Sequence, residues 1–321
     1  MKDNNKLFIF TFYRFVQINN KKTIKNKLDK FVKKKVVRGT ILIANEGLNG
    51  SISGTKKDLI DILNLIKKLL KIRKLTVNMN ESDFLPFNRI KIRLKKETVS
   101  LGKGKIDVNK FQGTFVHPSK WNKLIKERNV KLIDTRNIYE IPIGKFKRAI
   151  NPDTNSFREF PKKFNDLEIK KDQKIAIYCT GGIRCEKASA FLKSNGYKNV
   201  MQLEGGILNY LEYVKRNNST SLWMGECFVF DERVTVNKKL SKGKFLQCHG
   251  CRNPITKKDT NSKYYEKGVS CPYCYNSRNS EQKKKSYIRQ QQINHAERKQ
   301  KNHPFRTITL SDFDFSNKKL K

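Results

Sequence analysis

The chain has 321 residues, and its 70 lysines and arginines against 29 aspartates and glutamates give a formal net charge of +41. This length favours two to three domains. No segment approaches about 18 consecutive apolar residues, so the sequence excludes a typical membrane-spanning helix and we expect no membrane partner. Four of the seven cysteines form two CxxC pairs, which fits a reducing compartment better than a disulfide framework, and we expect a cytoplasmic location.

The positive charge favours a nucleic-acid partner, because cationic side chains that contact phosphates release counterions. Lysine far outnumbers arginine, however, and asparagine and isoleucine are abundant throughout. This pattern is typical of a strong nucleotide bias acting on exposed positions. We therefore assign only part of the charge to binding.

Residues 1–105 are predicted to form a ferredoxin-like (acylphosphatase-like) domain. Apolar periodicity predicts strands at 7–16, 36–47, 75–84 and 89–101, a hairpin strand at 51–55, and helices at 23–35 and 59–70. The order βαββαβ is typical of that sandwich. The apolar run at the N-terminus lacks a small-residue cleavage site, so it is interpreted as the first strand rather than a signal peptide.

The segment IANEGLNGSISGT, with Gly47, Gly50 and Gly54, raises the question of phosphate binding. It lacks the GK[ST] ending of a P-loop, so that signal is weak. A tight hairpin and an RNA-facing loop both remain open. Polar contacts of such a loop would come from Asn45, Glu46 and Asn49.

Residues 106–217 are predicted to form a parallel α/β domain, with strands near 131–136, 174–179 and 199–205 and helices on both faces. Ligands of such sheets bind beyond the carboxyl ends of the strands, and Cys179 lies at such an end. His117 precedes this domain and is interpreted as a linker contact rather than a catalyst.

The loop CTGGIR consists of Cys179, Thr180, Gly181, Gly182, Ile183 and Arg184. Its glycines allow the backbone N–H groups to curl around one sulfur atom, and a helix beginning near Cys185 adds its positive end. With the charge of Arg184, these groups should lower the pKa of Cys179 below about 8.5 and make it a nucleophile. The alternative is a buried cysteine that acts as a small apolar residue.

Neighbouring residues are given supporting roles. Cys185 is interpreted as a structural or resolving thiol, and Arg184 as a group that stabilises the thiolate or a phosphate. We expect Asp134 and Arg136 to brace the loop through an ion pair, with Glu140 in a similar role. Lys187 is either directed to the substrate or solvated.

Residues 218–280 contain Cys248, Cys251, Cys271 and Cys274, with 19 residues between the two CxxC pairs. This spacing predicts a structural four-cysteine zinc site that stabilises a small domain. The alternative is a reduced remnant packed by Tyr264, Tyr265, Tyr273 and Tyr275. Residues 281–321 are predicted to be a basic tail, either a solvated helix or disordered, that could contact phosphates.

The segments 130–153 and 195–211 around CTGGIR are similar to the rhodanese domain, whose loop cysteine carries a persulfide. Together with GTILIANEGLNGSISGT, WMGECFVFDERVTV and the paired CxxC motifs, the chain resembles the rhodanese-type tRNA uridine-34 5-hydroxylase family over about residues 8–275. The resemblance implies oxygen-dependent conversion of the wobble uridine to 5-hydroxyuridine. It also implies that the anticodon arm of tRNA is the partner, that molecular oxygen is the co-substrate, and that an electron donor exists that the sequence does not identify.

Two alternative functions belong to protein classes other than hydroxylases. A sulfurtransferase would pass sulfur through a Cys179 persulfide, and the residues alone favour it, because the loop suits a persulfide and no flavin, haem, iron or nucleotide motif is seen. An RNA-binding module would leave Cys179 without a role. The resemblance covers more of the chain than the loop does, and it favours the hydroxylase.

Overall fold

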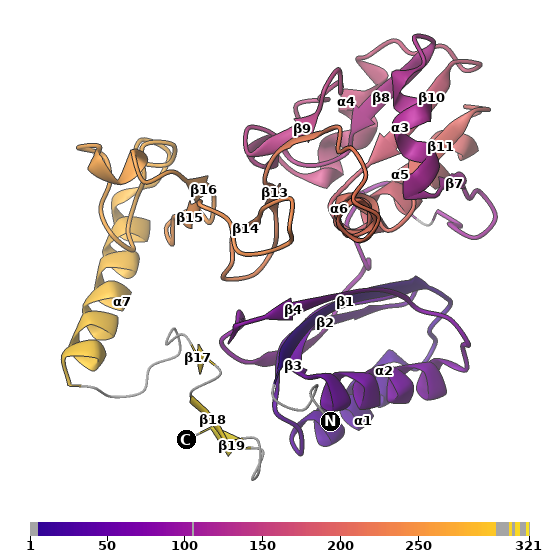
Figure 1. The fold of residues 1–321 in the computed structure, drawn as a ribbon. Coiled ribbons are helices and arrows are strands. Elements are labelled where there is room, and N and C mark those ends of the chain that lie inside the picture. Colours follow the sequence, from indigo (N-terminus) through magenta and orange to yellow (C-terminus); the bar gives the residue numbers. More distant parts are fainter. Residues whose placement is uncertain (1–5, 105, 300–307, 310–311, 315–318, 321) are drawn as a thin grey trace.

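The computed structural model describes residues 6–104, 106–299, 308–309, 312–314 and 319–320, and Figure 1 shows their arrangement. The strands are β1 (Leu7–Phe15), β2 (Val37–Ala44), β3 (Gly47–Thr55), β4 (Thr76–Ser82), β5 (Phe84–Leu85), β6 (Ile90–Leu94), β7 (Thr114–Val116), β8 (Val130–Asp134), β9 (Gly144–Phe146), β10 (Lys174–Tyr178), β11 (Val200–Leu203), β12 (Trp223–Gly225), β13 (Cys227–Phe228), β14 (Thr235–Val236), β15 (Leu246–Gln247), β16 (Pro254–Ile255), β17 (Ile308–Thr309), β18 (Phe313–Asp314) and β19 (Lys319–Leu320). The helices are α1 (Lys21–Val32), α2 (Lys56–Leu70), α3 (Pro118–Lys126), α4 (Phe160–Asn165), α5 (Ile183–Ser194), α6 (Gly206–Arg216) and α7 (Ser280–Arg298).

The first sheet has the strand order β4-β1-β3-β2-β6. Strand β3 pairs antiparallel with β1 and β2, and β4 pairs antiparallel with β1, which confirms the ferredoxin-like prediction. Strand β6 adds a fifth, parallel strand beside β2. Side chains alternate along β1, so Phe8, Phe10 and Phe12 pack in one apolar cluster with residues of α1 and α2.

The second sheet has the order β7-β11-β10-β8, and all its strands are parallel, as predicted. Successive side chains of β10 point to opposite faces of this sheet and so belong to two separate hydrophobic cores. Ala176 and Tyr178 pack with residues of α3 and α6, whereas Ile175 and Ile177 pack with residues of α4 and α5. Helices therefore cover both faces, and α5 follows β10 directly at the carboxyl edge of the sheet.

The face of the N-terminal sheet that α1 and α2 leave uncovered is directed towards α5 of the second domain (Figure 1). Tyr13 and Phe15 on this side pack in one cluster with Ala190 of α5 and Val108. The start of α5, where the cysteine loop ends, is therefore packed against the N-terminal sheet.

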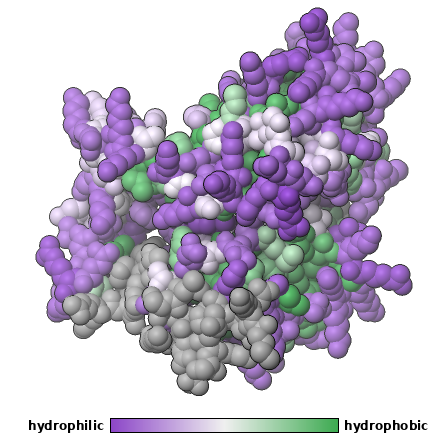
Figure 2. Space-filling view, in the orientation of Figure 1, coloured by the Kyte–Doolittle hydropathy of each residue, from purple (hydrophilic) through white to green (hydrophobic). Residues whose placement is uncertain are grey.

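The last third consists of short strand pairs and the helix α7. The basic stretch after Asn279 is helical over Ser280–Arg298, and the rest of the predicted tail lies mostly outside the described residues. Hydrophilic side chains cover much of the face shown in Figure 2, as the composition predicts. Among the helices described, none is long and apolar enough to cross a membrane.

Candidate active site at Cys179

Cys179 lies directly after β10 and is completely buried. Helix α5 begins at Ile183, slightly earlier than the predicted start near Cys185, so Ile183 and Arg184 belong to its first turn. Gly182 caps the helix at a φ of 95°, a conformation that favours glycine. The backbone N–H of Gly182 donates a hydrogen bond to Cys179 Sγ over 3.1 Å. The loop thus directs a backbone donor at the sulfur.

The start of α6 fixes the other side of the loop. The N–H groups of Ile207 and Leu208 donate to the carbonyl oxygens of Cys179 and Thr180 over 2.9 and 3.1 Å. Gly206 approaches so closely that a Cβ there would lie 2.5 Å from the carbonyl oxygen of Cys179. The Gly205-Gly206 pair therefore lets one helix end bind the loop carbonyls while another helix end faces the sulfur.

The surroundings of Cys179 lower its pKa to about 6. Burial alone would raise it, but the Cys185 thiol, the charge of Arg184 and the backbone N–H groups of Cys185 and Gly182 together outweigh burial. The thiolate is therefore the expected form of Cys179 at neutral pH.

Cys185 has the opposite character. It is fully buried, and burial followed by the hydrogen bond and the negative charge of Cys179 raises its pKa well above the usual range. Its sulfur also lies 3.6 Å from Thr135 Oγ1, whose hydroxyl donates to the carbonyl of Tyr178. Cys185 is therefore a neutral thiol that supports the charge of Cys179.

Arg184 is held by a carboxylate. Its Nη1 and Nη2 donate to Glu140 Oε1 and Oε2 over 2.5 and 2.9 Å, and Nη2 also donates to Thr180 Oγ1. Both charged side chains are buried, and Glu140 lies in the short turn Ile138–Glu140. Arg184 still acts on Cys179 electrostatically, but its pairing with Glu140 leaves it less suited to bind a phosphate directly than the sequence suggested.

A second buried pair supports Glu140. Arg136 Nε and Nη2 donate to Asp134 Oδ1 and Oδ2 over 2.9 and 2.7 Å, the ion pair expected from the sequence. Arg136 Nη1 also donates to the backbone carbonyl of Glu140 over 3.2 Å. Tyr178 completes the group by donating its hydroxyl to Asp134 Oδ2. Asp134 and Arg136 thus position the Glu140–Arg184 pair.

Tyr13 of the N-terminal sheet covers the loop, a role that the sequence did not reveal. Its hydroxyl donates to Glu186 Oε1 over 2.6 Å, and a Cβ on Gly182 would lie 2.8 Å from the same hydroxyl oxygen. Burial and the nearby carboxylate raise the pKa of Tyr13, and burial raises that of Glu186. Both groups are therefore neutral over a wider pH range than usual, beside a thiolate.

The structure contradicts both interpretations of Lys187. Its side chain is fully buried, and its Nζ donates to Glu46 Oε1 over 2.7 Å and to Glu97 Oε2 over 2.6 Å. The backbone carbonyl of Val99 accepts a further hydrogen bond. Lys187 therefore anchors α5 to the N-terminal sheet and is neither solvated nor free to bind a substrate.

The glycine-containing segment forms the tight hairpin of β2 and β3, with Asn45 and Glu46 at its turn. Glu46 binds Lys187 and the N–H of Thr98, Asn49 donates to the carbonyl of Thr98, and Asn45 accepts from Lys21. These intramolecular contacts favour the hairpin interpretation over an RNA-facing loop. His117 caps α3 by accepting from the N–H of Ser119 and is likewise structural.

The four cysteines of the C-terminal third meet at one point. Their sulfur atoms all lie within 4.8 Å of one another, and three of the separations are 3.8 to 3.9 Å. A tetrahedral zinc ion with Zn–S bonds of about 2.3 Å separates its ligands by about 3.8 Å, so Cys248, Cys251, Cys271 and Cys274 fit that ion. Arg289 of α7 donates to the carbonyls of His249 and Gly268 and braces both knuckles.

Comparisons with known proteins cover most of the chain. Residues 7–98 match the family described as UPF0176 acylphosphatase like domain, and residues 117–213 match the family described as rhodanese-like domain. The chain is 46% identical over 298 residues to the tRNA uridine(34) hydroxylase of Pelagibacter ubique (strain HTCC1062). The matched region covers 92% of this chain and 97% of that protein.

Similar solved structures match a smaller part of this chain. A rhodanese-related protein from Thermoplasma volcanium is 24% identical with a TM-score of 0.26, over 31% of this chain and 92% of that one. A rhodanese-like domain protein from Staphylococcus aureus is 24% identical with a TM-score of 0.26, over 30% of this chain and 90% of that one.

Proposed function

Because the chain belongs to the tRNA uridine(34) hydroxylase family, we propose that it hydroxylates C5 of uridine 34 in tRNA and that Cys179 is the reactive residue. The observation that carries the proposal is the Cys179 thiol itself. It lies at the carboxyl end of β10, receives the Gly182 N–H, and has a lowered pKa. A thiolate at this place is a nucleophile supplied with stabilising donors before any substrate binds.

The reaction replaces the C5–H bond of uridine with C5–OH. One atom of molecular oxygen enters the base, and the other leaves as water after accepting two electrons and two protons from a donor that acts with the enzyme. The thiolate, or a persulfide formed when the thiolate accepts sulfane sulfur from a small donor, takes part in this oxidation. We place the reaction in the cytoplasm, because tRNA is the substrate.

The buried state of Cys179 sets a condition on the reaction. A base cannot touch a sulfur atom that has no exposed surface, so the cover formed by Tyr13 must move when tRNA binds. Single-stranded RNA readers unstack a base and insert it into a pocket. We propose that uridine 34 enters between the N-terminal sheet and the start of α5.

We propose four parts with separate roles. Residues 1–105 and 218–280 hold the anticodon arm on either side of the catalytic part, residues 106–217. The basic residues 281–321 contact phosphates. A zinc ion held by the four cysteines would fix the shape of the third part and supply stability rather than chemistry.

A second candidate is a sulfurtransferase that passes sulfur through a Cys179 persulfide. The loop favours it, because the backbone N–H groups and Arg184 that stabilise a thiolate also stabilise a persulfide anion. Thiosulfate and cyanide separate the two candidates. A sulfurtransferase forms thiocyanate at a high rate without tRNA, whereas we expect slow thiocyanate formation and oxygen-dependent modification of tRNA.

The proposed function is tested by mass spectrometry of tRNA nucleosides from cells that lack their own enzyme. Expression of this chain should produce 5-hydroxyuridine, and growth without oxygen should reduce it. Absence of 5-hydroxyuridine in aerated cells that contain the folded protein would reject the hydroxylase.

A further inference from the structure

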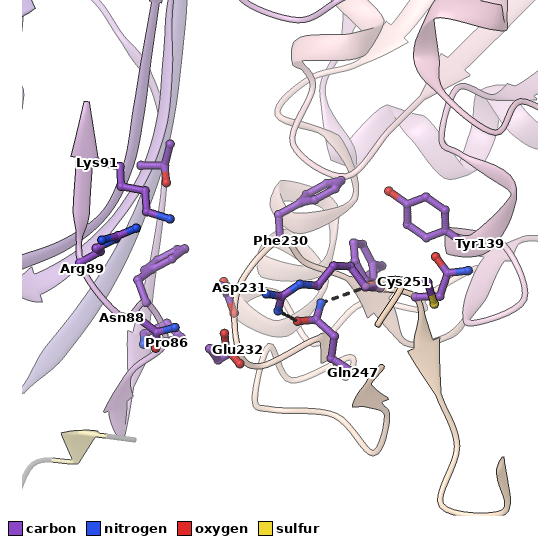
Figure 3. A pocket seen from close by; sticks show the side chains of 15 residues that line it. Pro86, Asn88, Arg89, Lys91, Tyr139, Phe230, Asp231, Glu232, Gln247 and Cys251 are labelled. Carbon is purple, nitrogen blue, oxygen red and sulfur yellow. Dashed lines mark hydrogen bonds between the residues drawn. The ribbon is translucent and has the colours of Figure 1, made fainter. Parts of the chain in front are cut away.

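A cavity of about 760 Å³ lies between three parts of the chain. One wall comes from the segment Pro86–Lys91 at the edge of the N-terminal sheet, and the opposite wall from Tyr139 and the segment after β13 (Figure 3). The first cysteine knuckle, including Arg252, closes a third side. Cys179 does not line this cavity. Its size lies within the range of pockets that bind a small organic ligand.

Aromatic rings form one wall. The rings of Tyr139 and Phe228 meet edge to face at 5.4 Å, and those of Phe228 and Phe230 at 5.0 Å. Phe230 is nevertheless 62% exposed, so part of its ring is open to a ligand. Such a ring provides a face on which a planar base can stack.

Cations lie on two sides of the cavity, with Arg89 and Lys91 at the edge of the N-terminal sheet and Arg252 in the first cysteine knuckle. Arg89, Lys91 and Arg252 all line the cavity, and among the residues that the structure describes none of the three forms an ion pair with a carboxylate. Burial, followed by the positive charges of Arg89, Arg93 and Arg252, lowers the pKa of Lys91. An anion among these cations would offset their positive charge.

The acidic residues of the cavity offset these cations only in part. Asp231 is bound to Arg233, whose Nε and Nη2 donate to its two carboxylate oxygens over 2.9 and 2.7 Å. Glu232 remains, and burial raises its pKa. The cavity therefore combines an exposed ring with a surplus of positive charge.

Arg184 connects the cavity to the cysteine loop. Its guanidinium carbon lies 5.8 Å from the centroid of the Phe230 ring, and the same side chain stabilises the Cys179 thiolate. Tyr139, another lining residue, precedes Glu140, the carboxylate that holds Arg184. Arg184 thus lies beside a ring of the cavity and also acts electrostatically on Cys179.

We propose that this cavity binds one nucleotide of single-stranded RNA, with the base stacked on Phe230 and the phosphate bound by Arg89, Lys91 and Arg252. Resting on the proposed function, the occupant is a nucleotide of the anticodon loop next to uridine 34. Its binding would hold the loop while uridine 34 turns towards Cys179.

The test measures binding of a fluorescent anticodon stem-loop RNA to the full chain. Phe230→Ala should weaken binding about tenfold through loss of one stacked base. Arg89→Gln should weaken binding and reduce the slope of log affinity against log salt by about 0.7 to 1. Phe115→Ala, another exposed ring at 39%, and Lys57→Gln on α2 are matched controls that should bind like the wild type.

Three outcomes would overturn the proposal. One is that Phe230→Ala and Arg89→Gln bind the stem-loop like their controls while the wild-type enzyme forms 5-hydroxyuridine. Another is that uridine monophosphate binds as tightly as the stem-loop and is not displaced by it, which would assign the cavity to a free nucleotide. The third is that Phe230→Leu, which keeps the apolar packing without a ring, binds the stem-loop like the wild type. The loss in Phe230→Ala would then come from misfolding, which its thermal unfolding would also reveal.

Failure of the proposed function looks different. If the wild type forms no 5-hydroxyuridine but its RNA binding depends on Phe230 and Arg89, the cavity assignment stands and the hydroxylase assignment fails.

Discussion

Lys187 of α5 and Glu46 of the N-terminal hairpin form an ion pair, with 2.7 Å between Nζ and Oε1. Glu97 binds the same ammonium group from a third segment. The residue that follows the cysteine loop by one helical turn is therefore tied to another part of the fold. The N-terminal sheet does not only neighbour the reactive cysteine; it fixes the helix that begins beside it.

Replacing Lys187 should destabilise the protein strongly. Lys187→Met leaves Glu46 and Glu97 without their cation, and loss of one partner of a buried ion pair costs on the order of 3 kcal/mol. Denaturant unfolding measures this change. Lys198→Met, at an exposed lysine, should change the free energy of unfolding by less than about 0.5 kcal/mol. Equal effects of the two substitutions would contradict the anchoring role.

Removing the cover of Cys179 should make its sulfur accessible. Tyr13→Ala deletes the ring and hydroxyl that lie against Gly182 and Glu186, so iodoacetamide should modify Cys179 faster than in the wild type. Tyr13→Phe keeps the ring and should remain close to the wild type. Peptide mass spectrometry identifies the modified cysteine. Unchanged modification in Tyr13→Ala would show that another group covers the sulfur.

The ionisation of Cys179 predicts how stability depends on pH. Its pKa is about 6 in the folded protein and about 8.5 in an unfolded chain. Because the folded pKa is the lower one, the thiolate stabilises the fold fully above about pH 8.5, and this contribution is lost as the pH falls towards 6. The difference in unfolding free energy between the wild type and Cys179→Ser should therefore grow from pH 6 to pH 8.5. A difference that stays constant over this window would mean that the thiol is not ionised.

The four-cysteine cluster should hold about one zinc ion per chain. Elemental analysis of the purified protein measures this content. Cys271→Ser should release the ion, because three cysteine ligands bind zinc more weakly than four. Residues 218–280 should then unfold, because we expect their stability to depend on the metal. Cys227→Ala removes a buried thiol outside the cluster and should retain the zinc. Full zinc content in Cys271→Ser would contradict the assignment.

The sequence predicted those features that depend on neighbouring residues. The cysteine loop follows from a strand, two glycines and a helix within one short segment, and the zinc cluster follows from the spacing of two CxxC motifs. The cover and the anchor could not be predicted in this way, because Tyr13 meets Glu186 and Lys187 meets Glu46 across 173 and 141 residues of chain. The cavity beside Phe230 likewise combines segments that only the tertiary fold brings together.

The ion pair of Arg184 is another contact between distant segments that the sequence could not predict. The position of Arg184 at the end of the loop predicts a role near the thiolate. Its partner Glu140, however, lies 44 residues away along the chain, and the sequence indicates for Glu140 only a bracing role like that of Asp134 and Arg136. A charged residue near a reactive group can be found from the sequence, but whether its charge is already paired depends on the fold.

The central claim is that Cys179 carries the hydroxylation of uridine 34, and one measurement tests it most directly. Mass spectrometry should quantify 5-hydroxyuridine in tRNA from cells whose only copy of the enzyme is the wild type, Cys179→Ser or Cys227→Ala, each present as folded protein in equal amount. We predict normal 5-hydroxyuridine with the wild type and Cys227→Ala, and none with Cys179→Ser. Normal 5-hydroxyuridine with Cys179→Ser would contradict the account.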